Sequence, residues 1–416
     1  MSALPPGYRT VAVPADRLAE FRTTDQLAFA VVPDPEVEES LPFPIPPDRT
    51  MAVEAPDGTF AAVHGSYEFA MPVPGGGTVP CAGLTWVAVR PDQRRRGLLR
   101  AMIATHLERS LERGEPVSAL FAAEAAIYGR FGYGSAADDV RLTLPRGAAL
   151  RPVPGSDALT VHLERVDPDR HADLVEDLGR RAGAGRPGWM PRGAAPLRVR
   201  AVADPSAWRQ GFEPLLLATV REGQEVRGLA LLARKEAWGE AGPDYTVRVR
   251  LAAALDAAAT HRLWTFLLDL DLTTRVETPM LPVDDPLLHL LVNPRPVQRR
   301  TSDNLWVRLL DLPAALTARR YAAPLDVVLD VTDELLPQNA GRWRVAVDGT
   351  GAADVARTTA EADVRLDVRE LGALYLGGRS ATALASAGLL AGEVPALDRV
   401  TAAFASSRAP VCPWIF

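Results

Sequence analysis

Three arginines and a glycine form the segment of this chain with the clearest potential for chemistry. Arg94, Arg95 and Arg96 precede Gly97, after an apolar run at 84–89 and before apolar residues that recur at helical spacing from 98 to 111. This order predicts a strand, a basic loop and an amphipathic helix. A helix N-terminus offers unpaired N–H groups and the positive end of the helix dipole, and a glycine there lets a phosphate approach the backbone. The segment therefore predicts a pyrophosphate site, with a basic surface turn that caps the helix as the alternative.

The loop is neither of the two common nucleotide-binding loops. No G-x-x-x-x-G-K-[ST] and no G-x-G-x-x-G follows the strand, which disfavours ATP and dinucleotides. The loop resembles instead that of the GNAT acetyltransferases, in which an R/Q-x-x-G-x-G/A turn binds the pyrophosphate of acetyl-CoA. Arg94 and Gly97 match that pattern, and Leu99 departs from it at the last small position.

The elements around this loop predict one mixed α/β domain. Strand patterns and a Pro-Asp-Gly turn between 51 and 71 predict an antiparallel meander before the cofactor strand. After the long helix, 117–122 predicts another strand and 123–128 a short helix. Antiparallel strands followed by alternating helices and strands are typical of a mixed sheet covered by helices.

Two further units follow this domain. Proline and glycine accumulate at 145–156, which marks a boundary. The next unit loosely repeats the order of the first without its basic loop, with helices predicted at 171–181 and 257–270 and strands at 226–234 and 245–253. A third unit begins near Leu305, with strands predicted at 325–331 and 343–347 and helices at 368–376, 381–390 and 396–405.

The composition limits the classes of function. A chain of 416 residues suffices for two to four domains of ~100–200 residues each. The net charge of −6 argues against a nucleic-acid partner. The two cysteines and six scattered histidines lack metal-ligand spacing, so no metal is expected. No signal pattern and no apolar run of ~18 residues is present, so we expect a cytoplasmic protein without a membrane span.

Three motifs together resemble one branch of the GNAT enzymes. They are the RRRGLLRAM loop, the IYGRFGYG segment at 127–134 and LGALYLGG at 371–378, with an aromatic residue, Phe416, at the end. They are similar to the enhanced intracellular survival (Eis) family of N-acetyltransferases. The resemblance implies a catalytic GNAT domain (1–152), a central GNAT-like domain (153–300) and a domain resembling sterol carrier protein (301–416), assembled as a hexamer. It also implies acetyl-CoA as cosubstrate and a small polyamine or an aminoglycoside as acceptor.

The resemblance assigns roles to individual residues. Tyr128 would be the general acid that protonates the departing thiolate of coenzyme A, and the α-carboxylate of Phe416 would accept the proton of the substrate ammonium. The predicted cofactor-binding residues are Val87, Ala88 and Val89 for the pantetheine arm, Arg94, Arg95, Arg96, Gly97, Leu98, Leu99 and Arg100 for the pyrophosphate, and Ala123 and Glu124 beyond the next strand.

The sequence departs from the family pattern at three positions. Ala123 stands where some relatives carry serine, which removes one cofactor hydrogen bond. Near the acceptor, Ile415 stands where a relative has glutamate and Asn293 where aspartate is familiar. The acceptor pocket is therefore not conspicuously acidic, although polycations bind best to clustered carboxylates. Two alternatives stay open: a protein lysine as acceptor, and a binding protein without catalysis that carries a lipid-carrier-like module.

Overall fold

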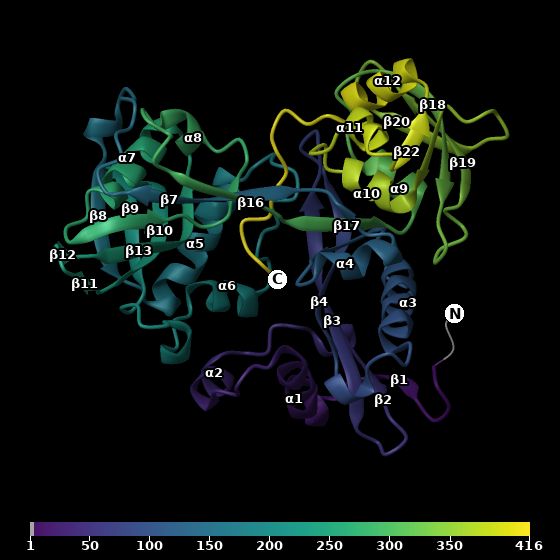
Figure 1. Ribbon diagram of the computed structural model, residues 1–416, viewed down its shortest axis with the longest axis horizontal. Coiled ribbons are helices and arrows are strands. Elements are labelled where there is room, and N and C mark those ends of the chain that lie inside the picture. The colour runs from purple at the N-terminus through teal and green to yellow at the C-terminus, as the bar shows by residue number, and fades with distance from the viewer. Residues whose placement is uncertain (1–3) are drawn as a thin grey trace.

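The computed structural model describes residues 4–416, which form three sheets flanked by helices (Figure 1). The first is a mixed sheet with the order β1-β2-β3-β4-β5-β17-β6. Its helices are α1 (Leu18–Phe29), α2 (Pro35–Ser40), α3 (Leu98–Glu112) and α4 (Ala125–Tyr128), and its strands are β1 (Arg9–Ala12), β2 (Thr50–Glu54), β3 (Phe60–Pro72), β4 (Thr78–Val89), β5 (Val117–Phe121), β6 (Gly134–Ser135) and β17 (Leu305–Leu309).

This sheet confirms the elements predicted around the basic loop. The apolar run at 84–89 is the second half of β4, and α3 begins at Leu98 directly after Gly97. Leu98, Met102, Ile103 and Leu107 are all at most 1% exposed, so the stripe at helical spacing is the face that α3 buries on the sheet. The predicted strand and short helix that follow are β5 and α4.

The second sheet has the order β15-β7-β14-β13-β10-β9-β8, with β16 paired to β7. Its helices are α5 (Pro168–Ala182), α6 (Ala195–Val202), α7 (Ala257–Leu268) and α8 (Pro286–Leu290), and a small hairpin, β11 (Trp238–Gly239) and β12 (Gly242–Pro243), protrudes from it. The strands are β7 (Asp138–Pro145), β8 (Thr160–Arg165), β9 (Leu216–Glu222), β10 (Glu225–Lys235), β13 (Tyr245–Ala254), β14 (Thr273–Glu277), β15 (Leu281–Pro282) and β16 (Gln298–Asp303).

The third sheet has the order β20-β19-β18-β21-β22. Its strands are β18 (Leu325–Thr332), β19 (Gly341–Val347), β20 (Ala353–Arg357), β21 (Val364–Asp367) and β22 (Leu390–Gly392), and its helices are α9 (Leu312–Ala318), α10 (Val368–Leu374), α11 (Ala381–Ser386) and α12 (Val394–Phe404). Among residues 4–416 no helix is long and apolar enough to cross a membrane.

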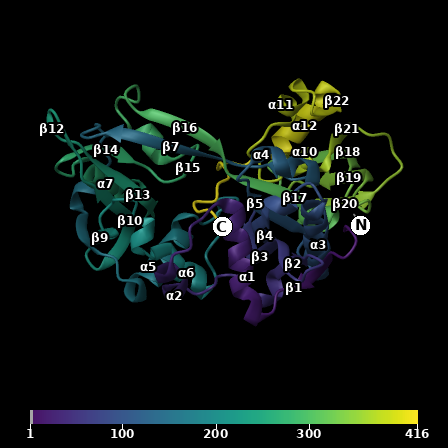
Figure 2. The same cartoon turned by 60° about the horizontal axis from the view of Figure 1, so that its bottom comes forward.

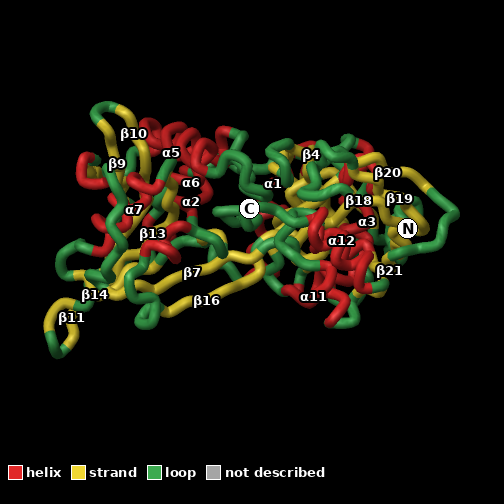
Figure 3. Tube along the Cα trace, turned by 90° about the horizontal axis from the view of Figure 1, so that it is seen from above, coloured by secondary structure: helices red, strands yellow, loops and turns green. Residues whose placement is uncertain are grey.

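A two-stranded ribbon joins the first two sheets. β16 and β17 follow each other along the chain and pair with β7 and β6, from Gln298 opposite Thr143 to Val307 opposite Gly134. Figure 3 shows β7 and β16 side by side along this ribbon. As a result β7, which precedes position 152, lies in the second sheet, and β17, which follows position 300, lies in the first. The boundaries at 152 and 300 therefore do not separate the sheets strand by strand, and as limits of folding units they stay predictions.

The last twelve residues run back from α12 into the space between the first two sheets (Figure 2). The buried Asn304, at the β16–β17 junction, holds Cys412 by two hydrogen bonds, of 2.8 and 3.1 Å. The Trp414 indole N–H donates to the Met190 carbonyl at 2.7 Å. These contacts fix the C-terminal segment against both units and bring its end to the first sheet.

Candidate active site

β4 and β5 run parallel and then separate, which opens a fork in the first sheet. They pair only from Cys81 opposite Val117 to Gly83 opposite Ala119, although β4 continues to Val89 and β5 to Phe121. Beyond Gly83 the backbone groups of β4 that face β5 have no ladder partner. Unpaired backbone N–H and C=O groups require hydrogen bonds from another source, so this edge suits an extended ligand rich in amides.

A bulge in β4 produces the divergence. The register with β3 shifts between Val63 and Gly65, and Trp86, opposite this shift, has a left-handed backbone with φ of 53°. A bulky residue there costs of the order of 1–3 kcal/mol and persists only where packing holds it. The indole of Trp86 packs against Phe21 and Phe43, at 5.9 and 5.4 Å between ring centroids. The bulge therefore bends Val87, Ala88 and Val89 away from β5.

The loop after β4 has the geometry of an anion site. Arg95 and Gly97 both adopt positive φ, of 62° and 79°, and Gly97 is the N-cap of α3 without any side-chain hydrogen bond to the first turn. The first N–H groups of a 15-residue helix are thus left for a ligand. A Cβ on Gly97 would meet nothing within 4 Å, so the space in front of the helix is open.

One cavity of about 560 Å³ joins the fork, the loop and α4. It is lined by most of the residues predicted for the cofactor and by the predicted acid: Val87, Ala88, Val89, Arg94, Arg95, Gly97, Leu98, Leu99, Arg100, Ala123, Glu124 and Tyr128. These residues come from three separate segments of the chain. The predicted set is therefore brought together in space, which a basic surface turn alone would not do.

Arg96 lies outside this cavity. Its guanidinium group donates to the Tyr8 hydroxyl at 3.3 Å, and that hydroxyl donates to Gln93 at 2.7 Å. Because the left-handed backbone of Arg95 turns the chain between its neighbours, adjacent arginines leave the loop in different directions. Arg96 therefore binds Tyr8 outside the cavity, whereas Arg94 and Arg95 line the cavity.

Tyr128, the last residue of α4, lines the cavity and is 8% exposed. Burial, and then the negative charge of Glu124, raise the pKa of Tyr128 to about 12. The described part of the chain provides no hydrogen-bond partner for its hydroxyl. The ring is held by an edge-to-face contact with Tyr133, at 6.0 Å between centroids. Tyr128 is therefore a protonated phenol at neutral pH with its donor free.

Glu124 stands at the N-cap position of α4, where its side chain could have capped the helix. It makes no such hydrogen bond and is exposed to the cavity. Its carboxylate contributes negative charge near Tyr128, and its effect on the tyrosine pKa is smaller than that of burial.

Phe416 lies at the same fork but on the other face of the sheet. Its ring contacts Phe69 at 4.9 Å and Phe121 at 5.3 Å between centroids, and a Cβ on Gly83 would come within 3.2 Å of it. Along β5, Phe121 faces this side, whereas Leu120 faces α3 and Tyr128. The terminal residue and Tyr128 thus approach the fork from opposite faces, and Phe416 does not line the 560 Å³ cavity.

The cavity also contains residues that sequence reasoning missed. Ala28 and Phe29 of α1 close one side of it, and Gln93, Ile127, Arg130 and Phe131 complete the lining. Nothing in the local pattern of α1 distinguishes these positions from a surface helix. Asp25, one turn earlier on the same helix face, is half-buried, and burial raises its pKa to about 6.

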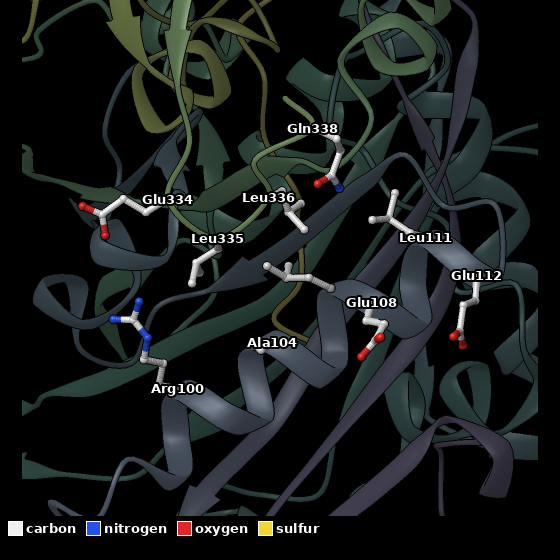
Figure 4. A pocket seen from close by; sticks show the side chains of 10 residues that line it. Arg100, Ala104, Glu108, Leu111, Glu112, Glu334, Leu335, Leu336 and Gln338 are labelled. Carbon is white, nitrogen blue, oxygen red and sulfur yellow. The ribbon is translucent and has the colours of Figure 1, made fainter. Parts of the chain in front are cut away.

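A second cavity of about 680 Å³ lies between α3 and the loop after β18. Figure 4 shows Leu111 on α3 pointing toward the loop that carries Leu335, Leu336 and Gln338, whereas the carboxylates of Glu108 and Glu112 point away from that loop. It shares only Arg100 with the predicted site residues. It lacks both the helix N-terminus and the tyrosine, so the 560 Å³ cavity is the candidate active site.

Comparisons with known proteins identify the domains of this chain. Residues 9–136 and 188–309 match two acetyltransferase (GNAT) domain families, and residues 312–413 match the sterol carrier protein domain. An uncharacterized N-acetyltransferase of Streptomyces coelicolor is 40% identical over 93% of this chain and 94% of its own length. The N-acetyltransferase Eis of Mycobacterium tuberculosis is 35% identical over 87% of this chain and 88% of its own.

Solved structures show the same architecture over nearly the entire chain. The crystal structure of Eis1 from Mycobacterium abscessus superposes with a TM-score of 0.82 at 31% identity, covering 98% of this chain and 100% of that one. A GCN5-related N-acetyltransferase from Anabaena variabilis shares the fold, with a TM-score of 0.82 at 20% identity. With two GNAT domains, a sterol-carrier domain and relatives matched from end to end, this chain is a member of the Eis family of GNAT N-acetyltransferases.

Proposed function

We propose that this N-acetyltransferase transfers the acetyl group of acetyl-CoA to a primary amine of a small molecule, with Tyr128 as general acid and the α-carboxylate of Phe416 as general base. The observation that carries the proposal is the 560 Å³ cavity in which the open N-terminus of α3, the unpaired edge of β4 and the Tyr128 hydroxyl meet. Small polyamines and aminoglycosides are the acceptors that the family resemblance implies.

The residues of the cavity fit acetyl-CoA. Arg94, Arg95 and Arg100 are exposed and without ion pairs in the described chain, and with the first turn of α3 they would hold the pyrophosphate. The backbone of Val87 to Val89 would bind the amides of the pantetheine arm. When bound, acetyl-CoA supplies an activated acyl group as a thioester.

The acid and the base have separate tasks. In the transfer a C–N bond forms and the C–S bond breaks. The amine must be neutral to attack, so the Phe416 carboxylate takes one proton from the ammonium. Tyr128 gives its phenolic proton to the leaving sulfur, for which a hydroxyl that stays protonated at neutral pH is suited. The second proton, which the nitrogen loses as the amide forms, restores the phenol, so that one proton is released per turnover.

The test is amine-dependent release of free thiol from acetyl-CoA, measured with a panel of amines for the wild-type chain and for Tyr128→Phe. We expect the variant to keep its dissociation constant for acetyl-CoA by calorimetry and to lose about 10²- to 10⁴-fold in kcat. An unchanged kcat would reduce Tyr128 to a packing residue. The proposed function would be overturned if acetyl-CoA does not stabilise the wild-type chain against heat and the chain acetylates no amine in the panel.

A further inference from the structure

The C-terminal segment ends in two residues that the backbone does not hold. Chain ends are poorly ordered unless other parts of the structure fix them. Trp414 is the last residue that bonds to a distant segment, through its indole N–H. Within residues 4–416, Ile415 and Phe416 make no hydrogen bond and no ion pair, and Ile415 is 62% exposed. The position of the Phe416 carboxylate therefore depends on the contacts of the Trp414 and Phe416 rings.

The second unit provides the site that holds Trp414. This site is the α5–α6 loop (183–194), which contacts the C-terminal segment at three positions. The Pro187 carbonyl accepts from the Val411 N–H at 3.1 Å, and the Met190 carbonyl accepts from the Trp414 indole at 2.7 Å. The guanidinium group of Arg192 lies over the indole, 4.6 Å from the ring centroid. The indole is thus held at its edge by Met190 and on its face by Arg192.

The α5–α6 loop is itself fixed on the first sheet. The Gly188 N–H donates to the carbonyl of Pro72, the last residue of β3, at 2.8 Å. Gly188 has φ of 75°, and a Cβ there would come within 2.8 Å of the Leu305 side chain, so the loop approaches β17 closely. The Trp189 indole donates to the Gly179 carbonyl of α5 at 3.0 Å. The loop therefore keeps a defined position relative to the fork.

Glu176 of α5 fixes Arg192 in place. One carboxylate oxygen accepts from the Arg192 backbone N–H at 2.8 Å, and the other lies 3.8 Å from the guanidinium group. The two side chains are only 12% and 15% exposed. A guanidinium group that is largely removed from water is attracted to the face of an indole. Arg192 therefore restricts the orientation of the Trp414 ring.

The orientation of Trp414 is passed on to the terminal residue. The Trp414 ring contacts that of Phe416 at 5.7 Å between centroids and that of Phe69 at 5.8 Å, both edge to face. Such contacts have a preferred geometry, so a turn of the indole shifts the Phe416 ring. The carboxylate lies on the second residue after Trp414, and two extended residues span up to ~7 Å. A misplacement of ~1 Å can cost ~10²-fold in rate, so this contact matters for a base.

We propose that the second unit positions the general base, with Arg192 and Trp414 as positioning residues that act through the Phe416 carboxylate. The inference rests on the proposed function, in which that carboxylate deprotonates the acceptor. It assigns a contribution to catalysis to a unit that supplies no residue to the 560 Å³ cavity.

The pH dependence of turnover tests this inference. Above the pKa of the acceptor the amine arrives neutral, so it no longer needs the base. Thiol release gives kcat/KM at pH 7 and pH 10, with the accepted amine of lowest pKa, for the wild-type chain, Arg192→Met, Trp414→Phe and a chain that ends at Ile415. We expect the three variants to lose about tenfold or more at pH 7 and about twofold or less at pH 10, because only the ammonium form depends on a well-placed carboxylate. Their dissociation constants for acetyl-CoA should stay unchanged.

Controls separate positioning from folding. Arg192→Lys keeps a positive charge over the indole and should retain most of the activity at pH 7. Arg357→Met is the matched control, because Arg357 of the third unit lies over Trp343 at 4.1 Å from the ring centroid, and it should leave both rates unchanged. Melting temperatures are compared for all variants. Trp414→Phe keeps an aromatic ring and loses only the donor to Met190, so it tests the inference even if Arg192→Met does not fold.

The failure of this inference differs from that of the proposed function. If Arg192→Met and Trp414→Phe retain full activity, or lose the same factor at both pH values, they are packing residues and this inference is overturned. The proposed base still stands in that case if the chain ending at Ile415 shows the loss at pH 7 that recovers at pH 10. If that shortened chain turns over normally at pH 7, the base assignment fails and the inference with it.

Discussion

Burial of Tyr128 determines the pKa of its hydroxyl. Its phenol lies in the cofactor cavity among apolar side chains, and the raised pKa follows first from that burial. Sequence motifs indicate the residue, whereas only the fold shows that its hydroxyl is free and that Phe416 reaches the same fork from the other face. Arg96 illustrates the limit of local reasoning, because a single left-handed residue, Arg95, determines which arginine lines the cavity.

The pKa of Tyr128 predicts the shape of the pH profile. A general acid must be protonated, and a phenol with a pKa raised to about 12 keeps its proton well above the ordinary value near ~10. The amine must lose a proton, so kcat/KM should rise from pH 6 to pH 10 without a falling alkaline limb in that range. Stopped-time assays of thiol release across this range check it. A falling limb near pH 10 that disappears in Tyr128→Phe would contradict the raised pKa.

At the scale of elements, the predictable parts are those whose signals are local. The β4-loop-α3 segment was predictable because an apolar run, a glycine and a helical stripe adjoin one another in sequence. The exchange of β7 and β17 between sheets was not, since it depends on pairing between residues more than 150 positions apart along the chain. Ala28 and Phe29 likewise gain a role only through the docking of α1 on the bulge at Trp86.

The loop geometry predicts that Arg94 and Arg95 contribute to acetyl-CoA binding and that Arg96 does not. Combined Arg94→Ala and Arg95→Ala should raise the KM for acetyl-CoA about tenfold or more and leave the KM for the amine nearly unchanged, because both side chains line the cavity. Arg96→Ala is the matched control, because Arg96 contacts Tyr8 instead. Equal effects of the control and the double variant on cofactor binding by calorimetry would refute the assignment.

A buried ion pair connects the third unit to the segment directly after α4. The guanidinium group of Arg308, on β17, donates to both carboxylate oxygens of Asp333, at 2.6 and 2.7 Å, and to the Phe131 carbonyl at 3.0 Å. Both side chains are at most 1% exposed. Removing one partner strands a buried charge, so Asp333→Ala should cost about 3–5 kcal/mol of unfolding free energy in denaturant titrations. Asp326→Ala, which breaks the exposed pair with Arg344, should have little effect, and equal losses would contradict this account.

At the scale of the molecule, we expect a symmetric homo-oligomer larger than a dimer, the hexamer that the family resemblance implies. Multi-angle light scattering at micromolar concentration measures the mass directly. A mass near the 44.7 kDa of one chain would contradict this expectation.

The last twelve residues contact all three units and end at the fork between β4 and β5. The segment leaves the third unit, is held by Asn304 and Met190, and ends with Phe416 among the rings at the fork. The proposed base at this position would depend on the arrangement of the whole chain, so the family resemblance points to Phe416 but no local motif does.

The central claim is that acetyl transfer at the fork uses Tyr128 and the α-carboxylate of Phe416. The most direct measurement is amine-dependent thiol release by a chain extended by three residues beyond Phe416, compared with one extended by three residues at its N-terminus. Each added residue displaces the carboxylate by up to ~3.3 Å. We predict that the C-terminal extension abolishes turnover while acetyl-CoA binding, melting temperature and oligomeric mass stay unchanged, and that the N-terminal extension is fully active. Normal turnover by the C-terminally extended chain would contradict the claim and assign the base to another group at the fork.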